Sequence, residues 1–170
     1  RPVPPPDTND PAYLNDLTEV MEVGGTVSTL RTPEQTQVAL FWTTNMVIQT
    51  NAAYRQIADN RELNLLDTAR LMAVGNMAAT DSLIATFDAK YFYNLWRPVT
   101  AIQRADTDGN AATGADPTWT PAVMTPNFPE YVAGHGSFVS AQAEVYTHFF
   151  GTQIEIDLES SVTRTTRHYA

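Results

Sequence analysis

The longest regular pattern in the chain is NLLDTARLMAVGNMAATDSLIATFD, residues 64–88. Apolar and small side chains recur there at helical spacing and define one face of a helix: Leu66, Ala69, Ala73, Met77 and Thr80. The alanine-rich neighbours of these residues would let another helix approach closely. The stretch therefore predicts one long helix and a fold built from helix contacts around it.

The sequence before this stretch predicts two further helices. Residues 10–25, DPAYLNDLTEVMEVGG, fit a short helix that ends at a pair of glycines. Thr32, Pro33 and Gln35 are typical of a helix start, because threonine caps, proline suits the first position and glutamine can close a capping box. Apolar residues continue at helical spacing as far as Gln49, so we expect a single helix over this length.

The sequence after the long stretch is less regular. Residues 90–97 either continue the long helix or form a separate one, and Pro98 forces a break or a kink. Residues 105–129 predict a long loop of the kind that is often functional, and residues 137–150 predict a helix closed by the following glycine. Residues 152–166 are ambiguous. Because strand patterns are few, the predicted fold class is all-α, a helical bundle with long loops that forms an incomplete domain.

Length and composition limit the possible classes of protein. A chain of 170 residues with 43% hydrophobic content fits one domain or a large part of one. Residues 1–12 are proline-rich and predict an extended lead-in, and residues 13–170 are expected to belong to one helical domain. The net charge of −9 argues against nucleic acid as a partner, and no apolar run is long enough for a membrane span. The absence of cysteine excludes disulfides, thiolate metal sites and cysteine nucleophiles.

The stretch KYFYNLWRP, residues 90–98, contains the only lysine of the chain. On a helix, Lys90 and Arg97 would lie within about 20° of each other, because seven residues make almost two full turns. Their ammonium and guanidinium groups could then converge on one tetrahedral or trigonal oxyanion such as phosphate. The alternative is an ordinary solvated pair of cations beside acidic residues such as Asp88.

A second candidate element is FPEYVAGHGSF, residues 128–138. Gly134, His135 and Gly136 lie where a loop enters the helix predicted for residues 137–150, and free backbone N–H groups at a helix start can bind an anion. A histidine beside such an anion could act as an acid or a base near neutral pH. The alternative is a capping turn with a surface histidine.

These two elements together resemble the vanadium-dependent haloperoxidases and the related type 2 phosphatidic-acid phosphatases (acid phosphatases). That superfamily carries K-x6-R-P, then P-S-G-H, then S-R-x5-H-x3-D. Lys90, Arg97 and Pro98 match the first part, and Gly134 and His135 match the second. Longer strings such as RTPEQT, DPTWTP and FPEYVAGH are similar to the soluble bacterial haloperoxidase-like branch.

The resemblance implies a role for each matching residue. Lys90 and Arg97 would bind the equatorial oxygens of vanadate, or of phosphate as its substitute, and Lys90 would also polarise the bound peroxide. Gly134 would contribute its backbone N–H, and His135 would be the catalytic acid or base. Phe128 occupies a position where chloride-oxidising members tend to carry phenylalanine and bromide-oxidising members histidine. Trp96 would line the same apolar wall of the substrate pocket.

The sequence departs from the family pattern in two places. Ala133 stands where the motif has serine, so one hydroxyl contact to the oxyanion is lost, worth about 1.5–3 kcal/mol for a charged hydrogen bond. The third motif, with the histidine that ligates vanadium or attacks phosphorus, is not found. His168 does not fit it, because position 162, six residues earlier, is valine rather than arginine. We expect the metal-ligating histidine outside this chain, either in a further part of the protein or on another chain.

Three interpretations of function remain open. The first is a haloperoxidase that uses vanadate, peroxide, a halide and a small organic substrate. The second is a phosphomonoesterase of the acid phosphatase type, and the third is a non-catalytic oxyanion-binding or structural fragment. A Ca²⁺ site near DTDGN and Asp116 is less favoured than a solvated turn, because the glycine is misplaced for an EF-hand loop.

Overall fold

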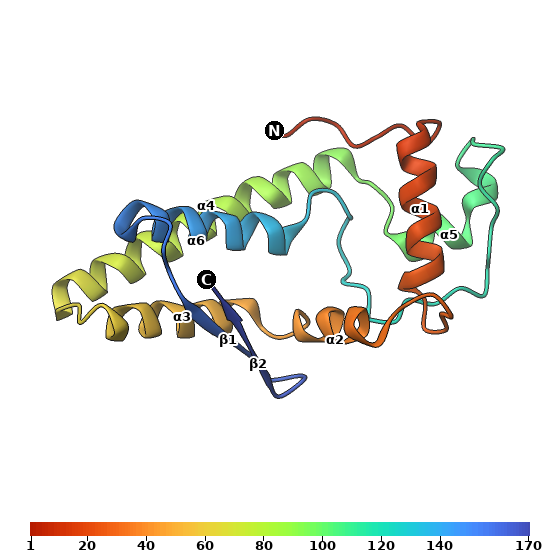
Figure 1. Ribbon diagram of the computed structural model, residues 1–170. Helices are drawn as coiled ribbons and strands as arrows, with labels where there is room; N and C mark the ends of the chain where they lie inside the picture. The colour runs from red at the N-terminus through yellow and green to blue at the C-terminus, as the bar shows by residue number, and fades with distance from the viewer. The chain divides into compact units, whose positions relative to one another are not determined.

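The computed structural model describes residues 1–170 and is mostly helical, with two compact units (Figure 1). Unit 1 consists of residues 1–36 and 88–132, and unit 2 consists of residues 37–87 and 133–170. None of the helices combines the length and the hydropathy needed to span a bilayer. The predominance of helices confirms the predicted helical class. The division into an extended lead-in and one domain stays a prediction.

Unit 1 is built around α1 (Pro11–Gly24) and α5 (Pro98–Gln103), which pack side by side (Figure 1). Their shared core is small: Leu17, Ala101, Ile102 and Trp119 are buried together. Trp119 also donates from its indole nitrogen to the carbonyl of Met21 at 3.0 Å. The long loop 105–129 begins with a 3₁₀ turn (η1, Ala105–Thr107) and is fastened to the helices through this tryptophan. The predicted loop is thus held to the helices by a buried aromatic side chain together with backbone hydrogen bonds such as Asp116 N–H to the Ile102 carbonyl.

The helix α2 (Pro33–Phe41) begins as its sequence predicts. The backbone N–H of Gln35 donates to Thr32 Oγ1 at 3.1 Å, and the N–H of Thr32 donates to Gln35 Oε1 at 2.8 Å, which completes a capping box. The predicted continuation to Gln49 is wrong. Asn45 takes extended backbone angles and caps a new helix, α3 (Met46–Asn60), by accepting from the N–H groups of Val47 and Ile48.

Unit 2 packs α3 against α6 (Gly134–Phe150) and the first part of α4 (Leu65–Tyr93) (Figure 1). The core is formed by residues from all three helices: Tyr54, Ile57, Leu71, Val145 and Tyr146. Gly75 is required at its position, because a Cβ atom there would overlap the hydroxyl of the fully buried Tyr54. This close approach fixes which side of α4 faces the core.

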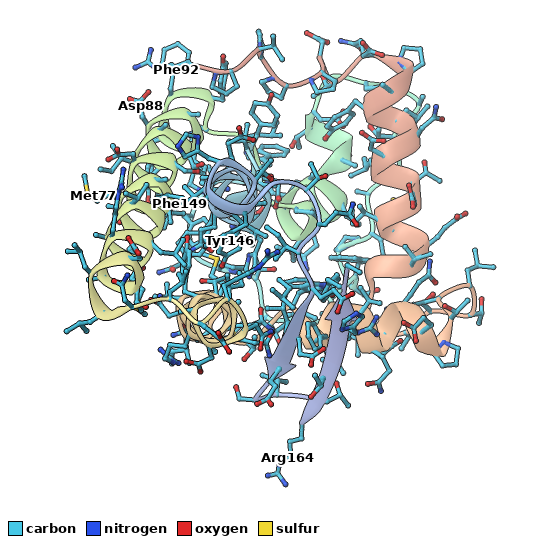
Figure 2. The ribbon with its side chains drawn as sticks, turned by 60° about the vertical axis from the view of Figure 1, so that its left-hand side comes forward. Met77, Asp88, Phe92, Tyr146, Phe149 and Arg164 are labelled. Atoms are coloured by element: carbon cyan, nitrogen blue, oxygen red, sulfur yellow. The ribbon has the colours of Figure 1, made fainter.

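The buried side of α4 is not the face that the sequence pattern indicates. Leu71, Gly75 and Ala79 are buried, whereas Leu66 and Met77 are 77% and 66% exposed. Figure 2 shows Met77 on the outer side of α4. The expected packing face is wrong, and the buried residues lie on nearly the opposite side of the helix. Apolar spacing alone does not show which side of an alanine-rich helix packs, and here several of the larger apolar residues lie on the outer side.

The ambiguous segment near the end of the chain forms a β-hairpin, which the all-α prediction lacks. The strands β1 (Ile156–Ser160) and β2 (Thr165–Tyr169) pair antiparallel, with Leu158 opposite Arg167. β1 lies beside α3, where Leu158 is buried with Phe41 and Ala53. One buried leucine in a short strand leaves too weak a periodic pattern to identify the hairpin from sequence.

Candidate oxyanion site

The backbone around the lysine-to-proline stretch differs from the predicted continuous helical face. The helix α4 ends at Tyr93, because Asn94 adopts a left-handed conformation (φ 48°). Arg97 is extended (φ −67°, ψ 152°), and Pro98 begins α5 at its first helical position. Lys90 therefore lies in the last turn of one helix, and Arg97 precedes the next. The two cations do not share a helical face, and their common position has another cause.

The loop segment 128–130 is what brings Lys90 and Arg97 together. The ammonium of Lys90 donates to the carbonyls of Pro129 at 3.0 Å and Glu130 at 2.7 Å. Lys90 is only 2% exposed, so these carbonyls replace the water that would otherwise solvate its charge. The lysine is therefore held in one place by backbone atoms of a segment nearly 40 residues away in sequence.

Arg97 binds the same segment from its own side. Its Nε donates to the carbonyl of Phe128 at 2.6 Å, and its Nη1 forms an ion pair with Glu130 Oε2 at 2.8 Å. Both cations also lie against the ring of Phe128: the Lys90 Nζ is 5.1 Å and the Arg97 Cζ 4.6 Å from its centroid. We call the group Lys90, Arg97, Phe128 and Glu130 the cation cluster.

The cation cluster carries more positive than negative charge. Burial, followed by the nearby Arg97 charge, lowers the pKa of Lys90, and Glu130 opposes this shift. The hydrogen bonds described above use two of the three ammonium N–H groups of Lys90 and two of the five guanidinium N–H groups of Arg97. One carboxylate thus faces two cations that still have donors available, which suits the binding of an anion.

A cavity of about 410 Å³ opens beside the cluster. The residues that line it include Trp96, Arg97, Phe128 and Pro129, so Trp96 and Phe128 lie near the guanidinium. Their role as the wall of a substrate pocket stays a prediction. Trp96 is 39% exposed, and the centroid of its ring lies 5.8 Å from the guanidinium carbon of Arg104. Lys90 does not line this cavity. The alternative partner considered for Lys90, Asp88, instead pairs with Arg1 at 2.8 Å.

The glycine–histidine element belongs to unit 2 and forms the start of α6. Gly134 is the first residue of the helix, and His135 is exposed in its first turn. Ala133 occupies the N-cap position, where its methyl group cannot accept a hydrogen bond from the helix. The first bond to the cap carbonyl comes from the N–H of Ser137 at 3.1 Å. The initial N–H groups of α6 are therefore left without a side-chain cap.

The structure brings together some predicted residues and adds one. Lys90, Arg97 and Phe128 meet in unit 1, whereas Gly134 and His135 are described within unit 2. Glu130 was missed, although an acidic residue inside the FPEY string, two positions after the predicted Phe128, was a visible signal. Its role became apparent only when the fold placed it on Arg97.

The other candidates from the sequence make local contacts. Asp108 accepts from Asn110 N–H and Thr113 Oγ1, and Asp116 accepts from Thr118, which lowers the pKa of Asp116. No three His, Asp or Glu side chains group as they would around a metal ion. His168 pairs with Asp157 at 2.9 Å across the exposed hairpin.

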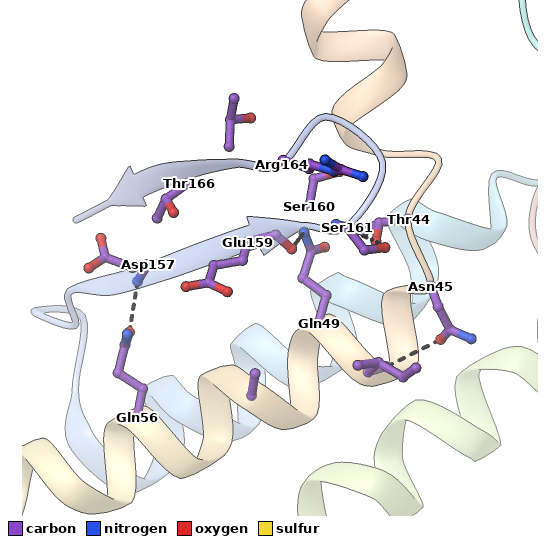
Figure 3. A pocket seen from close by; sticks show the side chains of 13 residues that line it. Thr44, Asn45, Gln49, Gln56, Asp157, Glu159, Ser160, Ser161, Arg164 and Thr166 are labelled. Atoms are coloured by element: carbon purple, nitrogen blue, oxygen red, sulfur yellow. Dashed lines mark hydrogen bonds between the residues drawn. The ribbon is translucent and has the colours of Figure 1, made fainter.

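A larger cavity, about 650 Å³, lies in unit 2 between α3 and the hairpin (Figure 3). Its polar groups largely bond to one another: Gln49 Nε2 donates to the Glu159 carbonyl at 2.9 Å, and Gln56 Oε1 accepts from the Asp157 N–H at 2.7 Å. The buried Gln49 Oε1 has no partner. None of the predicted site residues lines this cavity, so the cation cluster remains the candidate site.

Comparison with known proteins is consistent with these features. Residues 70–169 match the family model of the VCPO second helical-bundle domain. The vanadium chloroperoxidase of Curvularia inaequalis is 29% identical over 153 residues, which covers 75% of this chain and 24% of that protein. The crystal structure of a bacterial vanadium-dependent iodoperoxidase matches with a TM-score of 0.74 and 26% identity, over 99% of this chain and 42% of that one. The chain thus spans less than half the length of each of these relatives.

Proposed function

Because this chain belongs to the vanadium haloperoxidase family, we propose that it contributes the oxyanion-binding residues of an enzyme that oxidises halide with peroxide. The observation that carries the proposal is the buried ammonium of Lys90 close to the Arg97 charge, with the carboxylate of Glu130, paired with Arg97, as their nearby counter-charge. Two adjacent cations with one counter-charge are costly to keep in a protein interior unless an anion joins them. A structural ion pair alone would not need the second cation.

The donor set of the cation cluster fits vanadate or phosphate. Arg97 offers a planar fork of N–H groups and Lys90 a compact charge, a combination suited to several oxygens of one anion. Bound vanadate would supply the Lewis acid that activates peroxide. The protein's part is then to hold the oxyanion with Lys90 and Arg97 and to exclude water from the lysine side.

Gly134 and His135 enter the proposal through the family motif. The backbone N–H of Gly134 would donate to the oxyanion, and His135 would transfer a proton at its exposed imidazole. An uncapped helix start suits the first role, because its N–H groups are not already bound by a side chain. We further propose that the metal-ligating histidine comes from outside these 170 residues, since His168 is paired with Asp157 in the hairpin.

A phosphomonoesterase is the second candidate, because the same cations fit a phosphate ester. The two activities are separated by assaying the full-length protein for halide oxidation with vanadate and peroxide, and for hydrolysis of a chromogenic phosphate ester. We expect vanadate-dependent halide oxidation. Robust ester hydrolysis with no halide oxidation at any vanadate concentration would overturn the haloperoxidase, and the absence of both activities would leave an oxyanion-binding or structural protein.

The assay gains a matched pair of variants from α6. His135 and His148 are both exposed on this helix, in its first and last turns. We expect His135→Ala to reduce turnover by about 100-fold or more, the size typical of a general acid or base. His148→Ala should leave turnover unchanged. Equal effects of the two substitutions would remove His135 from the proposed mechanism.

A further inference from the structure

Glu130 occupies part of the guanidinium surface that the proposed oxyanion would use. Its Oε2 lies 2.8 Å from Arg97 Nη1, and its own backbone carbonyl accepts from Lys90 at 2.7 Å. The side chain is 38% exposed, so the carboxylate can turn into solvent without unfolding the loop. The same residue therefore anchors one cation through its backbone and covers the other through its side chain.

The charges of the cluster make this carboxylate a competitor for anions. Lys90 and Arg97 carry two positive charges, and Glu130 supplies one negative charge. A halide ion that displaced the carboxylate from Arg97 would exchange one single charge for another and gain little. An oxyanion with up to two charges and several oxygens would gain more, because it can accept from both cations at once.

We propose that Glu130 is a specificity-determining residue of the oxyanion site, where its carboxylate keeps monovalent halide off Arg97 and yields to a multivalent oxyanion. This inference rests on the proposed function, in which halide is a substrate and must not occupy the cofactor's binding residues. The carboxylate acts as an internal anion that holds Arg97 in position until the oxyanion arrives. The backbone contacts of Pro129 and Glu130 to Lys90 are unaffected by the exchange.

The test is the affinity of purified protein for inorganic phosphate, with orthovanadate as a second probe. Glu130→Gln keeps the shape and a hydrogen-bond acceptor for Arg97 but removes the competing charge. We expect Glu130→Gln to bind phosphate about tenfold more tightly, a size in keeping with the removal of one partly exposed like charge. At constant ionic strength, added chloride should weaken phosphate binding to this variant and leave the wild type almost unchanged.

Glu19→Gln is the matched control, because Glu19 is exposed on α1 and its substitution changes the net charge by the same amount. It should behave as the wild type does. If the wild type binds phosphate and Glu130→Gln binds it no more tightly, or if chloride competes equally with both, the role of Glu130 is refuted. If neither the wild type nor Glu130→Gln binds phosphate or vanadate, the proposed function itself fails.

A structure of the wild-type protein with phosphate provides a test that does not depend on the variant's folding. We expect phosphate on Arg97 and the Glu130 carboxylate turned away from Nη1. Phosphate on Arg97 with the Arg97–Glu130 ion pair still closed would overturn the proposal.

Discussion

Lys90 and His135 are the two predicted catalytic residues, and the protein treats them differently. Lys90 is 2% exposed and donates to two backbone carbonyls, whereas His135 is exposed in the first turn of an uncapped helix. Arg97 and Phe128 add an ion pair and an aromatic ring to the surroundings of the lysine. Comparable support around the histidine is missing, because its neighbour at the N-cap is Ala133.

The difference indicates that the surroundings of Lys90 are organised before a ligand binds, whereas the start of α6 needs a ligand to satisfy its N–H groups. Backbone carbonyls and a half-buried ring hold the lysine in place without an anion, so binding there requires little reordering. The start of α6 has N–H groups that an anion would satisfy, and alanine at the cap cannot do so beforehand. Oxyanion affinity should therefore come mainly from the cation cluster.

The largest expected effect on oxyanion affinity comes from a substitution in the cation cluster. Lys90→Ala removes a charged donor that is already in position, so we expect oxyanion affinity to fall about 10- to 100-fold, as for a charged hydrogen bond of roughly 1.5–3 kcal/mol. The measurement is a phosphate or vanadate titration of the folded variant by calorimetry, with its circular dichroism recorded alongside.

Arg61→Ala is the control for this loss of a cation. Arg61 is exposed in unit 2, where it donates to the Gln153 carbonyl at 2.8 Å. Its removal should change oxyanion affinity less than twofold, in line with a screened surface charge. Equal effects of the two substitutions would show that affinity follows net charge rather than the cation cluster.

A smaller effect, on the free energy of unfolding, is expected from a substitution at the N-cap of α6. Ala133→Ser would place a hydroxyl where it can accept from the N–H of His135 or Gly136, and an N-cap of this kind stabilises by about 1 kcal/mol. The free energy of unfolding measured in urea should rise by that amount. Ala111→Ser in the exposed loop should leave it within about 0.5 kcal/mol. No gain for Ala133→Ser would mean that the start of α6 is already satisfied in another way.

The sequence was most informative where local chemistry decides the structure. The sequence features that depend on a few adjacent residues are the Thr32–Gln35 capping box, the helix start at Pro98, the helix end at Gly151 and the matched motif around Lys90 and Arg97. The sequence failed where packing between distant segments decides. Helical periodicity wrongly placed Lys90 and Arg97 on one helical face. The structure instead brings both cations to the Phe128 ring from two separate elements, and their joint role at an oxyanion stays a prediction.

Glu130 illustrates the limit of local inference. Its partners Lys90 and Arg97 lie 40 and 33 residues earlier in the chain, and no periodic pattern connects them. The carboxylate and the backbone carbonyls of residues 128–130 are brought to the cations only by the path of the loop. The sequence therefore shows an acidic residue near Phe128, but the contact of its carboxylate with Arg97 is decided by tertiary structure.

The smallest predicted effect sharpens the picture of Lys90 as a buried charge. Burial lowers the pKa of its ammonium below the ordinary 10.5, so the folded protein releases this proton at a lower pH than the unfolded chain does. Between the lowered pKa and 10.5 the unfolded state binds more protons, and the contribution of Lys90 to the free energy of unfolding must therefore rise with pH. Oxyanion affinity should fall over the same interval, because the charged donor is lost.

The measurement is the free energy of unfolding in urea of the wild type and of Lys90→Met, compared from about pH 8 to pH 10.5. The difference between the two free energies should grow with pH in favour of the wild type. A difference that stays constant with pH would mean that Lys90 titrates as an exposed lysine does, and the contrast with His135 would then rest on hydrogen bonds alone.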